Sequence, residues 1–157
     1  MIGTLKNVID YSLKEMKLYS EDAASLVFKT GMAESGYRHL RQVSGPALGF
    51  FQCEPATIKD IWDNYVSYRT EIKVRLWELG YKEKADDLAF IGNIPVQVAF
   101  CRLKYRRDKH PLPSKDDLQG QAEYWKYCYN TTKGSGTISQ YMFRYRAYVN
   151  PLGTSHD

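Results

Sequence analysis

The sequence has no long hydrophobic run, and this absence excludes one class of protein. No apolar stretch approaches the ~18–20 residues that a membrane-spanning helix needs, so we expect no membrane span. The first residues, MIGTLKNVIDYSLKEMK, also lack the basic segment followed by an apolar stretch that marks a secretory signal. We therefore expect a protein that is made in the cytoplasm without a signal peptide.

Cysteine and histidine are scarce. The three cysteines are odd in number, widely spaced and free of C-x-x-C pairs, which predicts reduced thiols rather than a disulfide framework: Cys53, Cys101 and Cys128. The three histidines show no metal-ligand spacing such as H-E-x-x-H: His39, His110 and His156. We predict no metal and no cofactor. A catalytic Cys–His pair stays open, because sequence spacing does not fix distances in space.

Length and composition are those of an ordinary globular protein. The chain has 157 residues, of which 43% are hydrophobic and 25% are charged. This length is enough for one substantial core, and no segment is long and turn-rich enough to separate two domains. We predict a single domain over residues 1–157.

The net charge of +4 is unevenly placed. Residues 102–146 contain ten Lys and Arg against four Asp and Glu. Such a segment suits a polyanion such as nucleic acid, a lipid surface or an anionic cell-wall polymer, and the alternative is a solvated basic face. The sequence has no zinc finger, no RNP motif and no convincing helix-turn-helix signal. Nucleic acid is therefore not the favoured partner.

Apolar residues recur at helical spacing along most of the chain, and no sustained period-two alternation is present. Ser20 is the predicted N-cap of the second helix, and Pro55 stands where a first helical residue is expected. The pattern predicts a mostly α protein, with helices over residues 4–19, 21–34, 55–68, 69–79, 83–91, 95–107, 115–128 and 137–148.

The second predicted helix ends in an acid on its apolar face. The apolar positions stand at i, i+3, i+4 and i+8: Ala23, Leu26, Val27 and Gly31. Glu34, at i+11, continues this face, where its carboxyl is either desolvated or at the mouth of a cleft. Desolvation raises the pKa of a glutamate and makes it a proton donor near neutral pH. The alternative is a structural acid that caps nearby backbone or pairs with Arg38 or Arg41.

An ordered set of residues surrounds this acid. It comprises Glu34-Ser35, Tyr37, Ser44, Ala47-Leu48-Gly49, Phe50-Phe51-Gln52 and Pro55-Ala56-Thr57. The set resembles the signature of the soluble-type lytic transglycosylases, relatives of goose-type lysozyme. In that family, Glu-Ser is followed by an aromatic, a serine, Ala-x-Gly, two apolar residues, Gln and Pro-x-Thr.

Two later stretches agree with the family in order. GNIPVQVAFCRLKY supplies the family's Asn-Ile pair as Asn93 and Ile94, with Phe100 at the usual tyrosine. Gln97 stands where the family often has glycine, which puts close helix packing there in doubt. YCYNTTKGSG supplies the Tyr-Asn pair as Tyr129 and Asn130, followed by a glycine turn.

The resemblance implies a lysozyme-like single helical domain with a cleft that cleaves peptidoglycan glycan strands. Glu34 would act first as acid and then as base at the MurNAc–GlcNAc β-1,4 bond, and the muramic acid's own 6-hydroxyl would attack to give a 1,6-anhydro end. Tyr129 would orient or hydrogen-bond Glu34. The other implied substrate contacts, each with a structural alternative such as capping or core packing, are Ser35, Ser44, Gln52 and Asn130. Tyr37 and Tyr141 are added as aromatic faces for sugars.

Three rival functions remain open from the sequence. A hydrolytic goose-type muramidase or endolysin would use water and a second carboxylate, for which Glu54, Asp60 and Asp63 are nearest in sequence. The small size and missing signal also resemble a bacteriophage version of the family, so the chain is alternatively a virion protein of a tail or injection apparatus. In that setting it would contact other virion proteins and act at the bacterial cell wall. A nucleic-acid binder rests on the basic segment alone.

Overall fold

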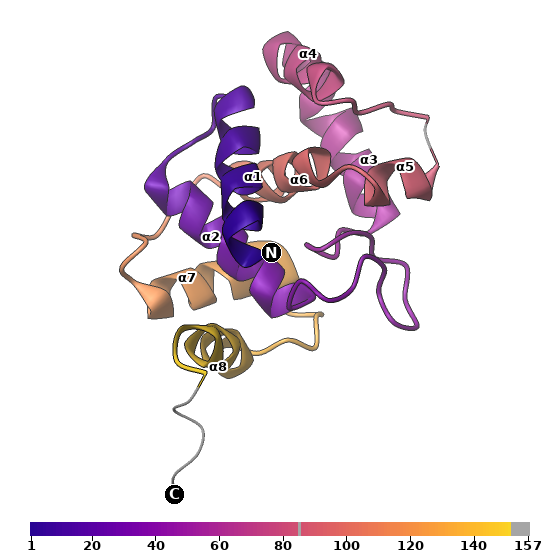
Figure 1. Cartoon of the computed structure of the whole chain (residues 1–157). Coiled ribbons are helices and arrows are strands. Elements are labelled where there is room, and N and C mark those ends of the chain that lie inside the picture. Colours follow the sequence, from indigo (N-terminus) through magenta and orange to yellow (C-terminus); the bar gives the residue numbers. More distant parts are fainter. Residues whose placement is uncertain (85, 152–157) are drawn as a thin grey trace, which may run out of the picture.

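The computed structural model describes residues 1–84 and 86–151, and these residues form helices joined by loops (Figure 1). His156 lies outside the described residues. A 3₁₀ turn, η1 (Val66–Tyr68), and a π-helical turn, η2 (Lys126–Asn130), each follow an α-helix closely along the chain. The α-helices are α1 (Ile2–Glu15), α2 (Glu21–Glu34), α3 (Pro55–Asn64), α4 (Thr70–Glu78), α5 (Asp87–Ile91), α6 (Ile94–Arg106), α7 (Leu118–Trp125) and α8 (Ile138–Val149).

The prediction of a mostly helical protein is confirmed. Over the two described ranges, β structure is limited to isolated antiparallel bridges of Leu48 with Arg41 and with Cys53. Both bridges lie in the loop between α2 and α3. No helix in the described part of the chain is long and apolar enough to cross a membrane.

Capping residues decide where several helices begin. Ser20 accepts a hydrogen bond from the Ala23 amide, and α3 begins at Pro55, as predicted. The predicted 83–91 and 115–128 helices are shorter at their starts than their apolar patterns indicated. Asp86 caps α5 and Asp117 caps α7, because each side chain accepts a backbone N–H three residues on.

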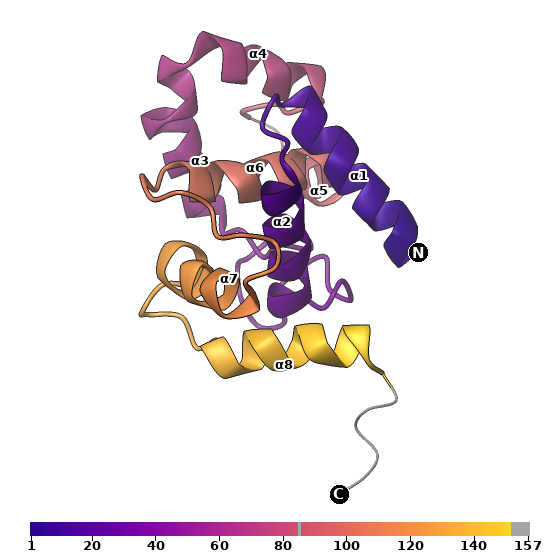
Figure 2. The same cartoon turned by 90° about the vertical axis from the view of Figure 1, so that its left-hand side faces the viewer.

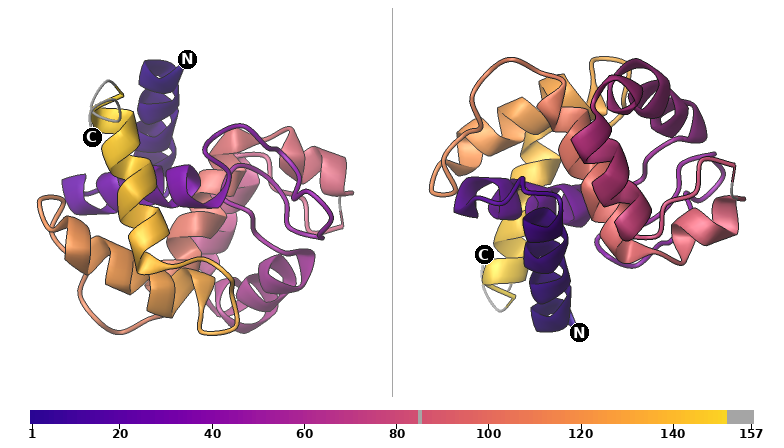
Figure 3. Two further views of the ribbon diagram at one scale, coloured as in Figure 1. Left: turned by 90° about the horizontal axis from the view of Figure 1, so that it is seen from below. Right: turned by 90° about the horizontal axis from the view of Figure 1, so that it is seen from above.

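α6 runs through the middle of the molecule between two hydrophobic clusters (Figures 1 and 2). Val98, Cys101 and Tyr105 pack into a cluster with α1, α2, α7 and α8. Ala99, Phe100 and Leu103, on the other faces of α6, pack with α3, α4 and α5. α4 lies at one end of the molecule and α8 lies at the other (Figures 1 and 2). There α8 crosses α2, as the view from below shows (Figure 3).

Gln97 joins α6 to the loop that follows α2. Its side-chain oxygen accepts the Phe50 amide at 3.0 Å, while its nitrogen donates to the carbonyls of Phe90 and Ile91. Gly49 makes room for this contact: it has a positive φ of 74°, and a Cβ there would lie 2.5 Å from the Gln97 oxygen. The departure from the family pattern at Gln97 is therefore accommodated by a glycine on the facing loop.

Candidate functional site

Among the described residues, a cavity of about 1060 Å³ lies at the C-terminal end of α2, and two smaller pockets have volumes of about 410 Å³ each. We call the larger cavity the Glu34 pocket. Its walls come from the end of α2, the loop before α3, the last turns of α6, the segment from Trp125 to Gly136, and the start of α8. Five of the residues that the sequence singled out line it: Glu34, Gln52, Tyr129, Asn130 and Tyr141.

Glu34 is the half-buried acid of this pocket. Burial raises the pKa of its carboxyl above the ordinary value of 4.5, while a hydrogen bond from Trp125 and the charges of Lys104 and Arg144 act in the opposite direction. The side chain of Asn130 also lowers the pKa. The carboxyl is thus desolvated yet surrounded by groups that stabilise its charged form, which is an arrangement suited to both releasing and accepting a proton.

Trp125 is the main hydrogen-bond partner of Glu34, and sequence reasoning missed it. Its indole Nε1 donates to Glu34 Oε1 at 2.9 Å, and its ring is buried and packs 5.2 Å from the ring of Tyr141. A tryptophan at the end of an apolar helix is expected to be a core residue, and Trp125 is indeed buried. Besides its larger ring, its single N–H donor distinguishes it from phenylalanine at the same position.

Tyr129 does not hydrogen-bond Glu34, which corrects the orienting role expected for it. Its hydroxyl is buried and donates to the Phe51 carbonyl at 2.6 Å. Lys104 lies 4.0 Å from the centre of the Tyr129 ring and donates to the Tyr129 carbonyl at 2.6 Å. Tyr129 therefore joins η2 to the loop between α2 and α3.

Gln52 and Tyr141 face the same pocket in different ways. Gln52 has a positive φ of 51° and donates its side-chain amide to the Gly49 carbonyl at 2.8 Å, so its position is fixed by the loop. Tyr141 is 1% exposed, and its hydroxyl has no hydrogen-bond partner among the described residues. A buried hydroxyl without a partner is uncommon, and this one is closed off from solvent, as is the ring that carries it.

Three predicted contacts do not line the pocket. Ser35 is buried; its hydroxyl donates to the Phe50 carbonyl at 2.6 Å and accepts the Tyr37 amide. Tyr37 is buried in the first hydrophobic cluster and donates its hydroxyl to the Phe28 carbonyl at 2.7 Å. Ser44 is exposed in the loop with a positive φ of 58°. Their contacts shape the loop after Glu34.

The three candidates for a second carboxylate do not all lie in the same pocket. Glu54 and Asp60 line the Glu34 pocket, whereas Asp63 lines a smaller pocket on the other side of α3. Asp60 pairs with Arg107 and accepts a hydrogen bond from Asn64, and these contacts lower the pKa of its carboxyl. Asp60 is consequently a stable carboxylate. Arg41, one proposed partner of Glu34, instead pairs with Asp87 at 3.7 Å.

Cys128 is the cysteine that lines the Glu34 pocket. Burial and the neighbouring charge of Asp108 raise the pKa of its thiol to about 11, so it is protonated at neutral pH. His110 lies 2.8 Å from Asp108 and is exposed. The Asp108 carboxylate therefore lies beside the Cys128 thiol, in the position that the histidine of a catalytic Cys–His pair would need. The part of the chain that the structure describes places no group of three or more His, Cys, Asp or Glu side chains for a metal ion.

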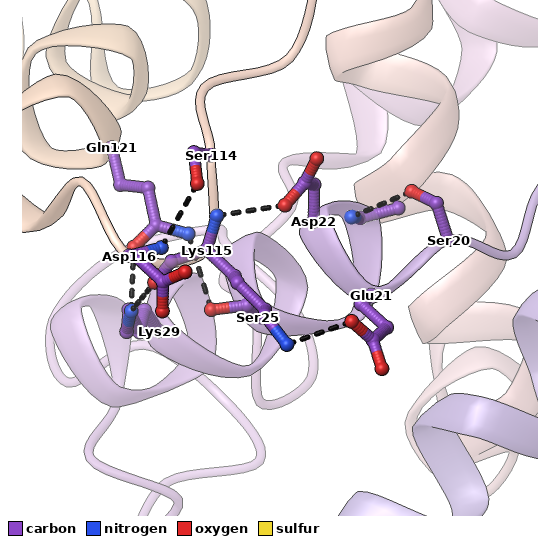
Figure 4. Close-up of polar contacts among 10 residues, drawn as sticks. Ser20, Glu21, Asp22, Ser25, Lys29, Ser114, Lys115, Asp116 and Gln121 are labelled. Carbon is purple, nitrogen blue, oxygen red and sulfur yellow. Dashed lines mark hydrogen bonds and ion pairs between the residues drawn. The ribbon is translucent and has the colours of Figure 1, made fainter.

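The start of α2 is anchored to the segment before α7 (Figure 4). The buried Lys29 donates to the Gln121 side-chain oxygen, and Gln121 in turn donates to Ser25 at 3.1 Å. Nearer the surface, Lys115 pairs with Glu21 at 2.7 Å, and its backbone N–H donates to Asp22. Because α2 carries Glu34 and α7 carries Trp125, this network fixes the two helices whose side chains meet in the pocket.

The chain matches none of the known protein-family models, none of the curated proteins and none of the solved structures with which it was compared.

Proposed function

We propose that the protein is a peptidoglycan lytic transglycosylase with a lysozyme-like fold, and that the Glu34 pocket is its substrate cleft. The proposal joins the motif resemblance of residues 34–57, 93–94 and 129–130 to one structural observation. That observation is a glutamate at the end of a buried helix, half-buried in the Glu34 pocket, with a raised pKa and an indole N–H on its carboxyl.

In the proposed reaction, Glu34 protonates the glycosidic oxygen as the bond to the N-acetylmuramic acid breaks. Burial raises the pKa of Glu34, which favours the protonated carboxyl that general acid catalysis requires. The developing positive charge on the sugar ring is of the oxocarbenium type. The Glu34 carboxylate left by proton transfer stabilises this charge, and Trp125 holds one of its oxygens in place.

In the second half-reaction, the carboxylate of Glu34 accepts the proton of the sugar's own 6-hydroxyl as that oxygen attacks the anomeric carbon. An intramolecular nucleophile is already held beside the reacting centre, so it needs no second carboxylate to activate water. The product is a 1,6-anhydromuramic end, formed without oxygen from solvent.

The fixed amide of Gln52 is the substrate contact in this proposal. Gln52 lines the pocket and is not hydrogen-bonded to Glu34. Lys104 and Arg144 add positive charge beside the acid, which favours a substrate that carries carboxylates, as peptidoglycan strands do. The site of action in this proposal is the bacterial cell wall.

A hydrolytic muramidase is the second candidate, because Glu54 and Asp60 line the same pocket. An inverting hydrolase needs its two carboxyls ~6.5–9.5 Å apart to hold a water, and a retaining one needs ~5–5.5 Å. Asp60 is already paired with Arg107, which leaves Glu54 as the stronger of the two for that role.

Mass spectrometry of purified peptidoglycan digested in heavy-oxygen water tests the proposal. We expect anhydro ends without solvent label from the natural chain. Glu34→Gln should remove nearly all of this activity while the far-UV circular dichroism stays unchanged, because general acid–base catalysis contributes roughly 10²–10⁴-fold. Glu83→Gln is a matched control, since Glu83 is exposed outside the pocket.

The outcomes separate the candidates. Labelled reducing ends would replace the transglycosylase with the muramidase and make Glu54→Gln the next variant. Full activity in folded Glu34→Gln would remove Glu34 from the mechanism. No cleavage of any peptidoglycan by the natural chain would refute both enzymes.

A further inference from the structure

Lys126 donates to three oxygen atoms, all of which belong to residues that line the Glu34 pocket. Its ammonium donates to the side-chain oxygen of Asn130 at 2.7 Å, to the Gly134 carbonyl at 3.0 Å and to the Gly136 carbonyl at 2.6 Å. An ammonium has three N–H donors, and all of them are used here. Lys126 therefore ties the π-helical turn η2 to the loop over residues 131–136.

This contact determines which way the Asn130 amide points. A side-chain amide has one accepting oxygen and one donating NH₂, which are commonly assigned from their surroundings. Lysine only donates, so the oxygen of Asn130 has to face Lys126. The NH₂ group is then the part of the side chain that is left for Glu34, which also lines the pocket.

The loop leaves the amide little room to rotate. A Cβ added at Gly134 would lie 2.4 Å from the Asn130 oxygen, and one added at Gly136 would lie 3.0 Å from the Asn130 nitrogen. The same Gly136 position is 2.6 Å from the ring of Trp125. Asn130 thus lies in a slot between two glycines, beside the indole that holds Glu34.

The π-helical turn is what brings these groups to one place. η2 continues α7 directly, so Trp125, Lys126 and Asn130 follow one another on a single rigid element. π-helical turns are rare and occur frequently at functional sites. Here Tyr127, Tyr129 and Asn130 all line the pocket, with Tyr129 buried and Tyr127 exposed.

We propose that Lys126 is a positioning residue, which acts through Asn130 by holding its NH₂ group toward the carboxyl of Glu34. This inference rests on the proposed function for its kinetic consequence. Its structural part, the orientation of Asn130 relative to Glu34, does not depend on what the protein cleaves.

Other charged and titratable groups also surround Glu34, and the test has to separate them from Lys126. Lys104 approaches from α6, Arg144 from α8 and the Trp125 indole from α7. The buried groups that lie within the field of the Glu34 charge are Cys53, Cys101, Tyr105 and Tyr129. None of these contacts is changed directly by a substitution at Lys126.

The experiment is an NMR titration of the Glu34 side-chain carboxyl in the natural chain, Lys126→Met, Asn130→Ala and the double variant. We expect each single substitution to raise the pKa of Glu34, because Asn130→Ala removes the NH₂ donor and Lys126→Met no longer holds it in place. In the Asn130→Ala background, Lys126→Met should then change it little further. Lys133→Met removes a charge of the same sign from the exposed loop that follows η2 and is the matched control, with no expected shift.

Each result either supports or refutes the inference. If the two shifts add in the double variant, Lys126 acts through its charge and not through Asn130. If Glu34 titrates in folded Asn130→Ala as in the natural chain, the donor role is wrong even if Lys126→Met fails to fold. Under the proposed function, kcat should fall about 10- to 100-fold in Lys126→Met with KM little changed. A natural chain without activity would refute that function and leave the titration result standing.

Discussion

Replacement of Trp125 by phenylalanine isolates one N–H from the rest of the site. The phenyl ring keeps most of the packing against Tyr141, but it has no donor for Glu34 Oε1, which now accepts the indole N–H at 2.9 Å. A hydrogen bond to a charged group contributes roughly 1.5–3 kcal/mol, and one to a neutral group about 0.5–1.5 kcal/mol. The bond therefore favours the ionised over the protonated carboxyl by about 1 kcal/mol.

Loss of this preference should raise the pKa of Glu34 further, because the Trp125 hydrogen bond no longer offsets part of the increase that burial causes. The assay is the NMR titration of the Glu34 carboxyl, combined with the pH dependence of peptidoglycan cleavage. We expect the alkaline limb of the activity profile to move to higher pH. The rate should fall about 5- to 10-fold, because the carboxylate is less well held in the transition state.

Trp62→Phe is the control for the change in ring volume. Trp62 is 5% exposed, like Trp125 a buried indole, but it packs against Tyr81 in the second hydrophobic cluster. Both variants should lose some stability, by less than the ~3–5 kcal/mol typical of Trp→Ala. Only Trp125→Phe should move the Glu34 titration. An unchanged or lowered pKa in folded Trp125→Phe would refute the assigned role of the indole.

Three further substitutions test the electrostatics and the anchoring of the site. Because burial raises the pKa of Glu34, the folded chain keeps this proton where the unfolded chain has lost it, so stability falls as pH rises from about 4.5 through the folded pKa. Glu34→Gln should therefore raise the melting temperature at pH 7 and not at pH 3.5, and an equal gain at both would contradict the linkage. Tyr129→Phe should lower the free energy of unfolding, measured by urea denaturation, by about 1–3 kcal/mol, since the buried Phe51 carbonyl loses its donor. A loss of activity without a loss of stability would instead support a catalytic role for Tyr129. Lys29→Met should lower the free energy of unfolding by a similar amount, because it leaves the Gln121 side-chain oxygen unpaired. The double variant Lys29→Met/Gln121→Leu should regain most of this loss. If the effects of the two substitutions simply add, the two side chains do not act as a pair.

The apolar face of α2 could be predicted from the sequence because it depends on residue spacing alone. Residues three and four apart share one helix face, so the apolar face of residues 23–31 and the position of Glu34 at its end followed from helix geometry. Ser20 and Pro55 were equally readable, because an N-cap and a first-turn proline act within a few residues of themselves. These local effects also account for the correct prediction of a mostly helical chain.

Contacts between segments that are far apart in the sequence could not be predicted in this way. Glu34 meets Trp125 across 91 residues, and Tyr129 meets Phe51 across 78. Neither pair has a local pattern, because a buried aromatic looks the same in sequence whether its polar atom faces a carboxyl or a backbone carbonyl. The sequence therefore assigned to Tyr129 a contact that belongs to Trp125.

The sequence by itself determined the helices, their main caps and the acid at the end of the second helix, because each depends on interactions within a turn or two. Tertiary structure alone decided which polar atoms meet that acid, how far it is desolvated, and that Ser35 and Tyr37 support its loop from within the core. Desolvation and hydrogen bonding are set by the atoms that pack around a group, and those atoms come from α6, α7, η2 and α8. Their meeting point is fixed only when the helices pack.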